Sequence, residues 1–459
     1  MSQDVAARLA AALDTLARDS NKSSDSHPRI HRIVIKIDPI DPLDWLRANS
    51  RTDGIYWQDR DDSARVAAIG EADSVTITDA LDLQEALRRI TRTLKRVDTG
   101  IRYFGGLRFD PERPESLRDN RWDRFAIARF VLPRFEIIAD DGKCYLACNF
   151  LAEETGTTAI AKIIEATRQL SFDPLTAKAE TPPLLARADS PDRAQWNDLI
   201  ADMLKSFTHG DCDKLVLARR TTLEFGNAVD PWHLLKRLRD LNKHCFVFGF
   251  QPDQSATFIG ASPEQLYSRT DNGILTEALA GTRPAVADKS ADNAFAAELL
   301  ESSKDRREHE LVVDGVAAAL DRVCERYSIT ESHGLLRLQS LQHLITRFEG
   351  QLRSNIDDCQ LLSELHPTPA VGGTPGDRAV EQLRTLEPID RGWYAGPVGW
   401  IGADRAEFAV AIRSALIHDR QIDIFAGAGI VGGSEADIEW IEVENKIIPF
   451  LILLYSGRP

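Results

Sequence analysis

The sequence predicts an α+β fold, and three features of its pattern support that prediction. Short runs rich in β-branched and aromatic residues, typical of strands, follow one another in groups along the 459 residues. Segments with helical periodicity are interspersed between these groups, so a repeating βαβ arrangement is not indicated. No internal repeat has the period of a solenoid. The chain is also long enough to bury a sizeable core.

The first part of the chain predicts a helix followed mainly by strands. An Ala-rich amphipathic segment at 3–18 predicts a helix, and the polar sequence NKSSDSHP after it predicts a loop. We expect two short strands, at 55–57 and 66–69, to pair with each other. The other elements predicted here are strands at 29–38, 104–106, 124–135 and 144–150 and a helix at 79–97.

A segment rich in Pro and Ala at 176–191 is the best candidate for a linker. We therefore predict an N-terminal α+β part at 1–185, which completes the sheets, and a catalytic part at 190–459. Two strands of the second part, at 257–260 and 265–269, are expected to pair around the turn that contains Glu264. Its other predicted elements are helices at 194–209, 232–242 and 294–326 and strands at 214–225, 245–251, 273–280, 339–351, 408–418 and 421–425.

The charge balance argues against some partners. Lys and Arg together number 56 against 71 Asp and Glu, which gives a formal net charge of −15, and no block of basic residues stands out. Nucleic acid is therefore not an expected partner. An anionic substrate would need locally concentrated positive charge or a metal ion at its binding site.

The first residues and the cysteines predict a cytoplasmic protein. The start, MSQDVAARLAAALDTLARDS, contains acidic residues and lacks a long apolar core, so it predicts neither a signal peptide nor a membrane span. Nothing later approaches a run of about eighteen apolar residues. The six cysteines form no CxxC pair and have no His at zinc-ligand spacing, so reduced, structural thiols are expected.

The C-terminal stretch predicts a strand, a turn and a helix. The apolar run at 422–425 predicts the strand, and the small residues at 426–433 predict a turn that a ligand can approach closely. Ser434 and Asp437 resemble a capping box at the start of the helix. The turn also matches GxGxxG at 427–432, but the further βαβ unit that a dinucleotide-binding fold needs is missing, so we discount that interpretation.

Two carboxylates and an ammonium share one stripe of this predicted helix. Glu439, Glu442 and Lys446 stand at i, i+3 and i+7, which places them within an arc of roughly 60°. The ordinary interpretation is a solvated face with an ion pair between Glu442 and Lys446, worth a few tenths of a kcal/mol. The alternative is a binding site.

Lys214 and Glu264 are charged residues beside apolar strands, and each has two interpretations. Lys214 at the start of KLVLAR is most often an edge lysine whose charged end reaches water. In a dry cavity without a close anion, a lysine becomes a base that can take a proton from water. Glu264 is ordinarily an exposed turn carboxylate. In the same cavity, apolar surroundings would raise its pKa and let it donate a proton to a departing hydroxyl.

The acidic residues of a second predicted helix also have two interpretations, a solvated face or part of a metal site. In SSKDRREHELV, Asp305 and Glu308 stand at i, i+3, and heavy charge on a helix is ordinarily a solvated face. One carboxylate from each of two helices, Glu308 and Glu442, is nevertheless the oxygen supply that Mg²⁺ prefers, with waters and a substrate oxygen as the other ligands.

Ten motifs, read together, resemble the chorismate-utilising enzymes. They cover roughly residues 194–450, and RYFGGLRFD adds a weaker resemblance in the N-terminal part. The resemblance implies stacked antiparallel sheets flanked by helices and a Mg²⁺-dependent active site. The motifs are KLVLAR, FIGASPEQL, EALAGTRP, SKDRREHELV, LQHLITR, LHPTPAVGGTP, WYAGPVGW, FAVAIR, FAGAGIV and a final E-x-x-E-x-x-x-K.

The resemblance also implies roles for individual residues. Glu308 and Glu442 would hold Mg²⁺, with Asp305 and Glu439 as supporting carboxylates, while Lys214 would be the base and Glu264 the acid. Arg413 is chemically suited to clamp a carboxylate with two hydrogen bonds. The positions that match substrate-binding residues are Gly281, Thr282, His343, Tyr394, Arg413, Gly427, Gly429 and Lys446.

Three positions indicate which reaction is expected. Members that use ammonia usually have Gln where this chain has Lys214, and aminodeoxychorismate enzymes have a lysine at the position of Ala280. Salicylate synthases often have Thr where this chain has Ala370. The chain thus resembles isochorismate synthases, isomerases that add water at C2 of chorismate and lose the C4 hydroxyl, in menaquinone or siderophore biosynthesis. The segments FGGLRFD, VLPRFEI and DRGWYAGPVGWIGADRAEFAVAIR are most similar to the menaquinone-type members. Salicylate synthase and an aminating enzyme with a glutaminase partner are the alternatives. No obligatory protein partner is expected.

Overall fold

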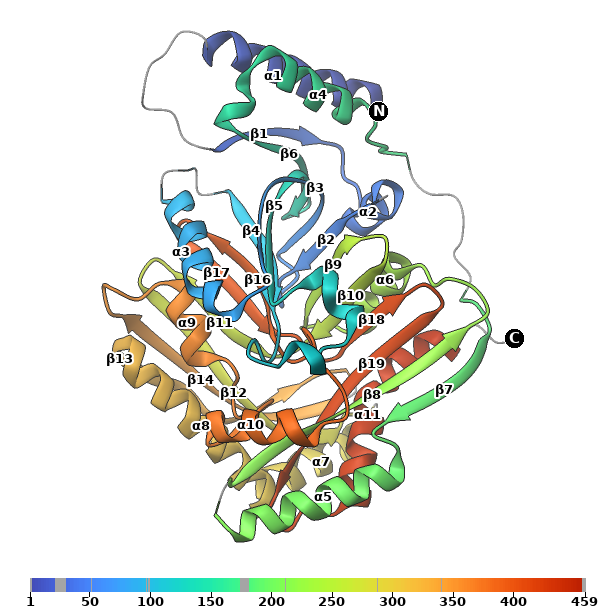
Figure 1. Cartoon of the computed structure of the whole chain (residues 1–459), viewed down its shortest axis with the longest axis vertical. Coiled ribbons are helices and arrows are strands. Elements are labelled where there is room, and N and C mark those ends of the chain that lie inside the picture. The colour runs from blue at the N-terminus through green and yellow to red at the C-terminus, as the bar shows by residue number, and fades with distance from the viewer. Residues whose placement is uncertain are drawn as a thin grey trace.

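The computed structural model describes residues 2–20, 30–50, 52–95, 97, 100–173, 181–210, 212–286, 288–339 and 341–455. Figure 1 shows strands through the middle of the molecule and helices on its outside, with α1 and α4 at one end and α5 at the other. The fold is α+β with antiparallel sheets flanked by helices, which confirms the predicted fold class.

The first part of the described chain contains more strand than α-helix. Its α-helices are α1 (Ser2–Ser20), α2 (Pro42–Asn49), α3 (Leu83–Leu94) and α4 (Thr157–Arg168). Its strands are β1 (Ile30–Ile37), β2 (Gly54–Gln58), β3 (Ala64–Ile77), β4 (Arg102–Leu107), β5 (Ala128–Asp140), β6 (Lys143–Leu151) and β7 (Leu184–Ser190). Short 3₁₀ helices are η1 (Ala80–Asp82), η2 (Glu115–Leu117), η3 (Asn120–Phe125) and η4 (Ala152–Thr155).

The second part alternates helices and groups of strands. Its helices are α5 (Arg193–Thr208), α6 (Pro231–Leu241), α7 (Lys289–Glu301), α8 (Ser303–Val323), α9 (Asp358–Leu365), α10 (Gly376–Leu386) and α11 (Ala436–Tyr455). Its strands are β8 (Lys214–Phe225), β9 (Phe246–Asp253), β10 (Ala256–Ser262), β11 (Gln265–Thr270), β12 (Gly273–Pro284), β13 (Cys324–Arg337), β14 (Leu341–Leu352), β15 (Gly373–Thr374), β16 (Pro397–Gly402), β17 (Arg405–Val410), β18 (Ser414–His418) and β19 (Gln421–Val431).

Every strand pair in the described residues is antiparallel. From β5, one series of pairings runs through β4, β16, β17, β11, β12 and β14 to β13. The other runs through β3, β2, β9, β10, β18 and β19 to β8. The strands β8 and β12, far apart in this order, both line the pocket described below.

An aromatic cluster joins the N-terminal part to the strands of the second part. The Trp122 ring lies 5.1 Å from Phe258 and 5.3 Å from Phe125 between ring centroids. Trp393 in turn lies 5.2 Å from Phe125. Buried edge-to-face aromatic pairs of this kind add to the stability that their buried area provides. The cluster fixes the chain immediately before Tyr394, which reaches the pocket.

The predicted linker at 176–191 is partly wrong. Residues 184–190 form β7, which pairs with β8, while 174–180 and the loop at 21–28 lie outside the described residues. The pairings of β2 with β9 and of β4 with β16 connect the two predicted parts. The division into 1–185 and 190–459 stays a prediction.

Two other predictions in the second part need correction. The single helix expected at 294–326 is two helices, because Ser302 has an extended backbone and its hydroxyl accepts a hydrogen bond from Asp305 N at the start of α8. The strand that follows, β13, was not predicted. The strands β10 and β11 exist, but β10 pairs with β9 and β18 while β11 pairs with β12 and β17, so they are not partners.

The small residues at 426–431 form a strand instead of the predicted turn. They continue β19, where Gly427 faces Ala218 and Gly429 faces Val216 of β8 in the ladder. The capping box is also wrong, because the Ser434 hydroxyl accepts from Val431 N before the helix begins. No helix of the described residues is long and apolar enough to cross a membrane. All six cysteines are buried, and none of them forms a disulfide.

Candidate active site

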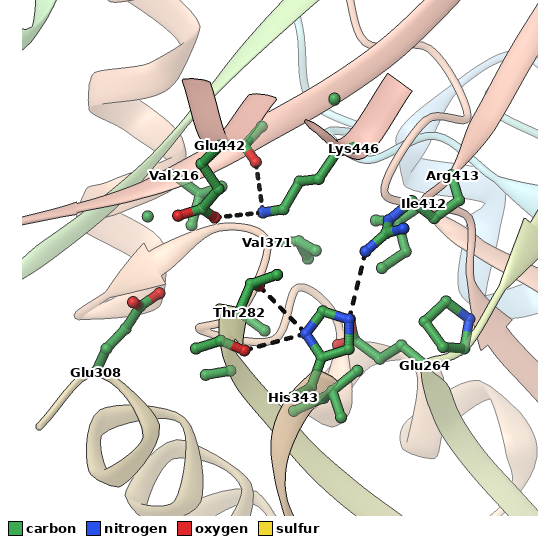
Figure 2. A pocket seen from close by; sticks show the side chains of 18 of the residues that line it. Val216, Glu264, Thr282, Glu308, His343, Val371, Ile412, Arg413, Glu442 and Lys446 are labelled. Atoms are coloured by element: carbon green, nitrogen blue, oxygen red, sulfur yellow. Dashed lines mark hydrogen bonds and ion pairs between the residues drawn. The ribbon is translucent and has the colours of Figure 1, made fainter. Parts of the chain in front are cut away.

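One pocket gathers residues from distant parts of the sequence, as Figure 2 shows. Its walls come from β8, β12, β14, β19, α8 and α11 and from the loops before β11, β15, β16 and β18. Every residue predicted to act on the substrate, bind it or hold the metal lines this pocket. Those residues are Lys214, Glu264, Gly281, Thr282, Glu308, His343, Tyr394, Arg413, Gly427, Gly429, Glu442 and Lys446.

Lys214 is fully buried at the start of β8, so it is not an edge lysine that reaches water. Its Nζ lies 2.9 Å from Glu308 Oε1, in an ion pair between β8 and α8. The sequence prediction required a lysine without a close anion, and in this arrangement that condition is not met. Gly429 leaves room for the pair, because a Cβ there would lie 3.0 Å from Lys214 Cε and would clash with Glu308 Oε1.

Glu264 is a buried acid rather than an exposed turn carboxylate. It follows Pro263 after β10, is 3% exposed, and its Oε1 lies 3.5 Å from the Thr368 hydroxyl. Burial, reinforced by the Glu277 carboxylate, raises the pKa of Glu264 to about 8, while Lys214 acts in the opposite direction. Glu264 is therefore mostly protonated near neutral pH, and its role as a proton donor stays a prediction.

The two predicted metal carboxylates each have a lysine partner. Glu442 Oε1 lies 2.7 Å from Lys446 Nζ, which also donates to the carbonyl oxygen of Gly427 at 2.9 Å (Figure 2). Glu308 pairs with Lys214 at 2.9 Å. Burial acts to lower the pKa of Lys304, but its hydrogen bond to Glu439 and, to a smaller degree, the charges of Glu308 and Glu442 raise it overall.

These carboxylates fit a magnesium ion in number and type. No group of three or more His, Cys, Asp or Glu in the described part of the chain has a metal-binding arrangement. Mg²⁺ needs less from a protein, because it commonly takes one or two carboxylates and keeps waters and substrate oxygens as its other ligands. Glu308 and Glu442 could supply these two carboxylates, and their side chains are 16% and 30% exposed, so water can reach them.

His343 orients Arg413. The His343 Nδ1 lies 3.0 Å from the carbonyl oxygen of Gly281 and 3.2 Å from the Thr282 hydroxyl. Because a carbonyl only accepts, Nδ1 must carry the hydrogen, which leaves Nε2 to accept from Arg413 Nη2 at 3.4 Å. Burial, then the Arg413 charge, lowers the pKa of His343 to about 3, so the ring is neutral and suited to this role.

Arg413 and Tyr394 place polar groups at the end of the pocket near β19. Arg413 has a φ of +51° between β17 and β18, and its guanidinium is a rigid fork that matches a carboxylate. The Tyr394 ring stacks on Phe425 at 5.3 Å between centroids. Burial raises the pKa of Tyr394, so its hydroxyl stays protonated and can donate a hydrogen bond.

The two predicted supporting carboxylates do not line the pocket. Asp305 pairs with Arg283 at 2.8 Å and packs beneath Gly281, where a Cβ would lie 3.2 Å from Asp305 Cβ. Glu439 is buried and pairs with Lys304 at 2.7 Å. Each therefore touches a residue that neighbours the site.

Sequence reasoning did not single out the apolar wall of the pocket. Strand alternation could have found part of it, because Val216 shares a face of β8 with Lys214. The apolar lining residues that were not predicted are Val216, Pro263, Leu279, Val371, Ile412, Phe425 and Ala426.

Comparison with known proteins gives close relatives over nearly the whole chain. Residues 13–455 match the family described as chorismate binding enzyme. The chain is 30% identical over 453 residues to the isochorismate synthase MenF of Bacillus subtilis, covering 93% of this chain and 95% of the relative. It is 34% identical over 426 residues to the salicylate biosynthesis isochorismate synthase of Pseudomonas aeruginosa, covering 90% and 87%. The solved structure of the menaquinone-specific isochorismate synthase MenF of Escherichia coli matches with a TM-score of 0.83 and 31% identity, covering 97% and 99%.

Proposed function

Because the chain belongs to the family of chorismate-binding enzymes, we propose that its pocket converts chorismate to isochorismate. The protein is an isomerase of the isochorismate synthase type. The observation that carries the reaction is a buried, protonated Glu264 in the same pocket as a buried Lys214. The Escherichia coli relative favours menaquinone biosynthesis as the pathway, and siderophore biosynthesis is the second possibility.

Lys214 and Glu264 would act on two positions of one ring. Lys214 takes a proton from a water molecule that attacks C2, and Glu264 donates its proton to the C4 hydroxyl as that group leaves. The double bonds of the ring shift between the two positions. Lys214 needs a neutral amine for this role, so the proposal requires Glu308 to move away from the amine before the reaction.

Glu308 and Glu442 would hold Mg²⁺, which when bound supplies positive charge and orientation for a ring carboxylate. The remaining binding groups are supplied by the chain. Arg413, held by His343, forms two hydrogen bonds to a substrate carboxylate. Tyr394 and Lys446 donate further hydrogen bonds, and the backbone at 281–282 and 427–429 contacts the substrate where few side-chain atoms intervene. These groups concentrate positive charge in the pocket, which an acidic protein needs in order to bind an anionic substrate.

The test is product identification after incubation of the purified protein with chorismate and Mg²⁺. Chromatography should show isochorismate as the product. Salicylate with pyruvate would instead support the salicylate synthase alternative, and anthranilate after addition of ammonium salts would support an aminating enzyme. No conversion would contradict all three. A cytoplasmic location and the lack of an obligatory protein partner stay predictions.

A further inference from the structure

A buried ion pair lies behind the pocket wall and has no part in the proposed chemistry. Arg391 and Glu387 follow helix α10, and their side chains are only 3% and 2% exposed. Arg391 Nε donates to Glu387 Oε2 at 2.8 Å. Neither residue lines the pocket, so neither is a candidate for contact with the substrate.

The same pair connects two walls of the pocket. Arg391 Nη2 donates to the carbonyl oxygen of Val216 at 2.5 Å, and Nη1 donates to that of Val371 at 2.8 Å. Glu387 Oε1 accepts from Ala218 N at 2.9 Å. Val216 and Val371 line the pocket from β8 and from the loop before β15. One buried side chain thus holds the backbone of both walls.

These two walls carry the proposed base and a contact of the proposed acid. Val216 is two residues after Lys214, on the same face of β8. Val371 is three residues after Thr368, whose hydroxyl lies 3.5 Å from Glu264 Oε1. The spacing between the walls therefore affects the spacing between Lys214 and Glu264.

Arginine is the residue type that this position needs. Its planar guanidinium presents five N–H donors in a fixed fork, so it can bind a carboxylate and two carbonyls at once. The ring of Phe109 lies 4.1 Å from the guanidinium carbon and packs against its face. A buried ion pair is weak evidence for stability in itself. The hydrogen bonds of Arg391 to two pocket walls instead indicate a role in holding those walls in place.

We propose that Arg391, oriented by Glu387, is a positioning residue that sets the separation of the proposed base and acid. It acts through the backbone of Val216 and Val371 and touches neither the substrate nor the reacting atoms. The inference rests on the proposed function, because it concerns the turnover of chorismate.

The first test compares Arg391→Lys with a matched control. The control is Arg269→Lys, because Arg269 forms a similarly buried two-bond pair with Asp358, at 2.8 Å for both bonds, away from the pocket. We expect Arg391→Lys to lower kcat by about tenfold to a hundredfold, since small displacements of reacting groups are costly. KM should stay within about threefold because no substrate contact is lost. The control should lose melting temperature to a similar degree and keep its kcat.

The second test needs no substrate. Hydrogen exchange followed by mass spectrometry should show faster exchange at 214–218 and 368–374 in Arg391→Lys than in the wild type and the control. Glu387→Gln, which keeps the shape of the pair, should show the same pattern more weakly and provides the test if Arg391→Lys does not fold. A kcat loss no greater than the control's, or unchanged exchange in both segments, would overturn the proposal. Failure of the wild type to convert chorismate would contradict the proposed function instead and would leave the exchange result interpretable.

Discussion

Replacement of Glu264 by glutamine removes the proposed proton donor and keeps the size of the side chain. General acid catalysis contributes roughly 100-fold to 10,000-fold to enzymatic rates, so we expect kcat to fall by that factor. Wild-type activity should also decline above pH 8, because the pKa of Glu264 is raised to about 8 and its proton is lost there. The decline should approach about tenfold for each pH unit and be absent from the residual activity of the variant.

The same substitution has a consequence for stability. Because burial raises the pKa of Glu264 from 4.5 to about 8, the native state binds a proton that the unfolded state has already lost. The free energy of unfolding therefore falls as the pH rises from 4.5 to 8. At about 1.4 kcal/mol for each pKa unit, the fall approaches about 5 kcal/mol. The variant lacks this loss of stability. The difference between its melting temperature and that of the wild type should therefore grow in favour of the variant as the pH rises through this range.

Glu407 offers a matched control for both measurements. It is another carboxyl whose pKa burial raises, to about 7, and it accepts from Trp57 Nε1 at 3.3 Å outside the pocket. Relative to the wild type, Glu407→Gln should likewise show a higher melting temperature as the pH rises from 4.5 to about 7, and it should keep full activity. The assays are chorismate turnover as a function of pH and thermal melting at acidic and alkaline pH. The reasoning is refuted if Glu264→Gln keeps more than about a tenth of wild-type kcat.

Three further predictions concern the metal and the substrate. Glu308→Gln should abolish the rise in melting temperature that Mg²⁺ produces in the wild type, whereas Glu310→Gln, on the exposed face of the same helix, should preserve it. Gly429→Ala should lose activity because its Cβ would clash with Glu308, and Gly432→Ala, which has open space, should not. Arg413→Lys should raise KM for chorismate by about tenfold to a hundredfold, measured by steady-state kinetics, because a two-bond clamp is lost; an unchanged KM would contradict the clamp.

The sequence predicted which residues gather in the pocket better than it predicted the backbone conformation there. Glu442 and Lys446 reach the pocket together because helical spacing alone places them on one face of α11. The glycines of β19 were assigned to a turn, since a run of small residues lacks the side-chain pattern of a strand. Their strand conformation depends on pairing with β8, and the local sequence pattern does not predict such long-range contacts.

Tertiary contacts account for the other differences. Ser302 interrupts a long helical pattern because its hydroxyl caps α8. A serine within a helical pattern can also simply face solvent, so the sequence alone did not indicate this break. The ion pair of Lys214 with Glu308 joins residues that are remote in sequence, so no spacing rule could reveal it. The same holds for Arg391, whose carbonyl partners lie on two other segments.

Turnover of chorismate in ¹⁸O-labelled water tests the central claim most directly. If Lys214 activates a water molecule and Glu264 releases the C4 hydroxyl, mass spectrometry of the isochorismate should find one heavy oxygen, located at C2. Isochorismate without the label would mean that the original hydroxyl is transferred within the substrate, which would contradict the roles assigned to both residues.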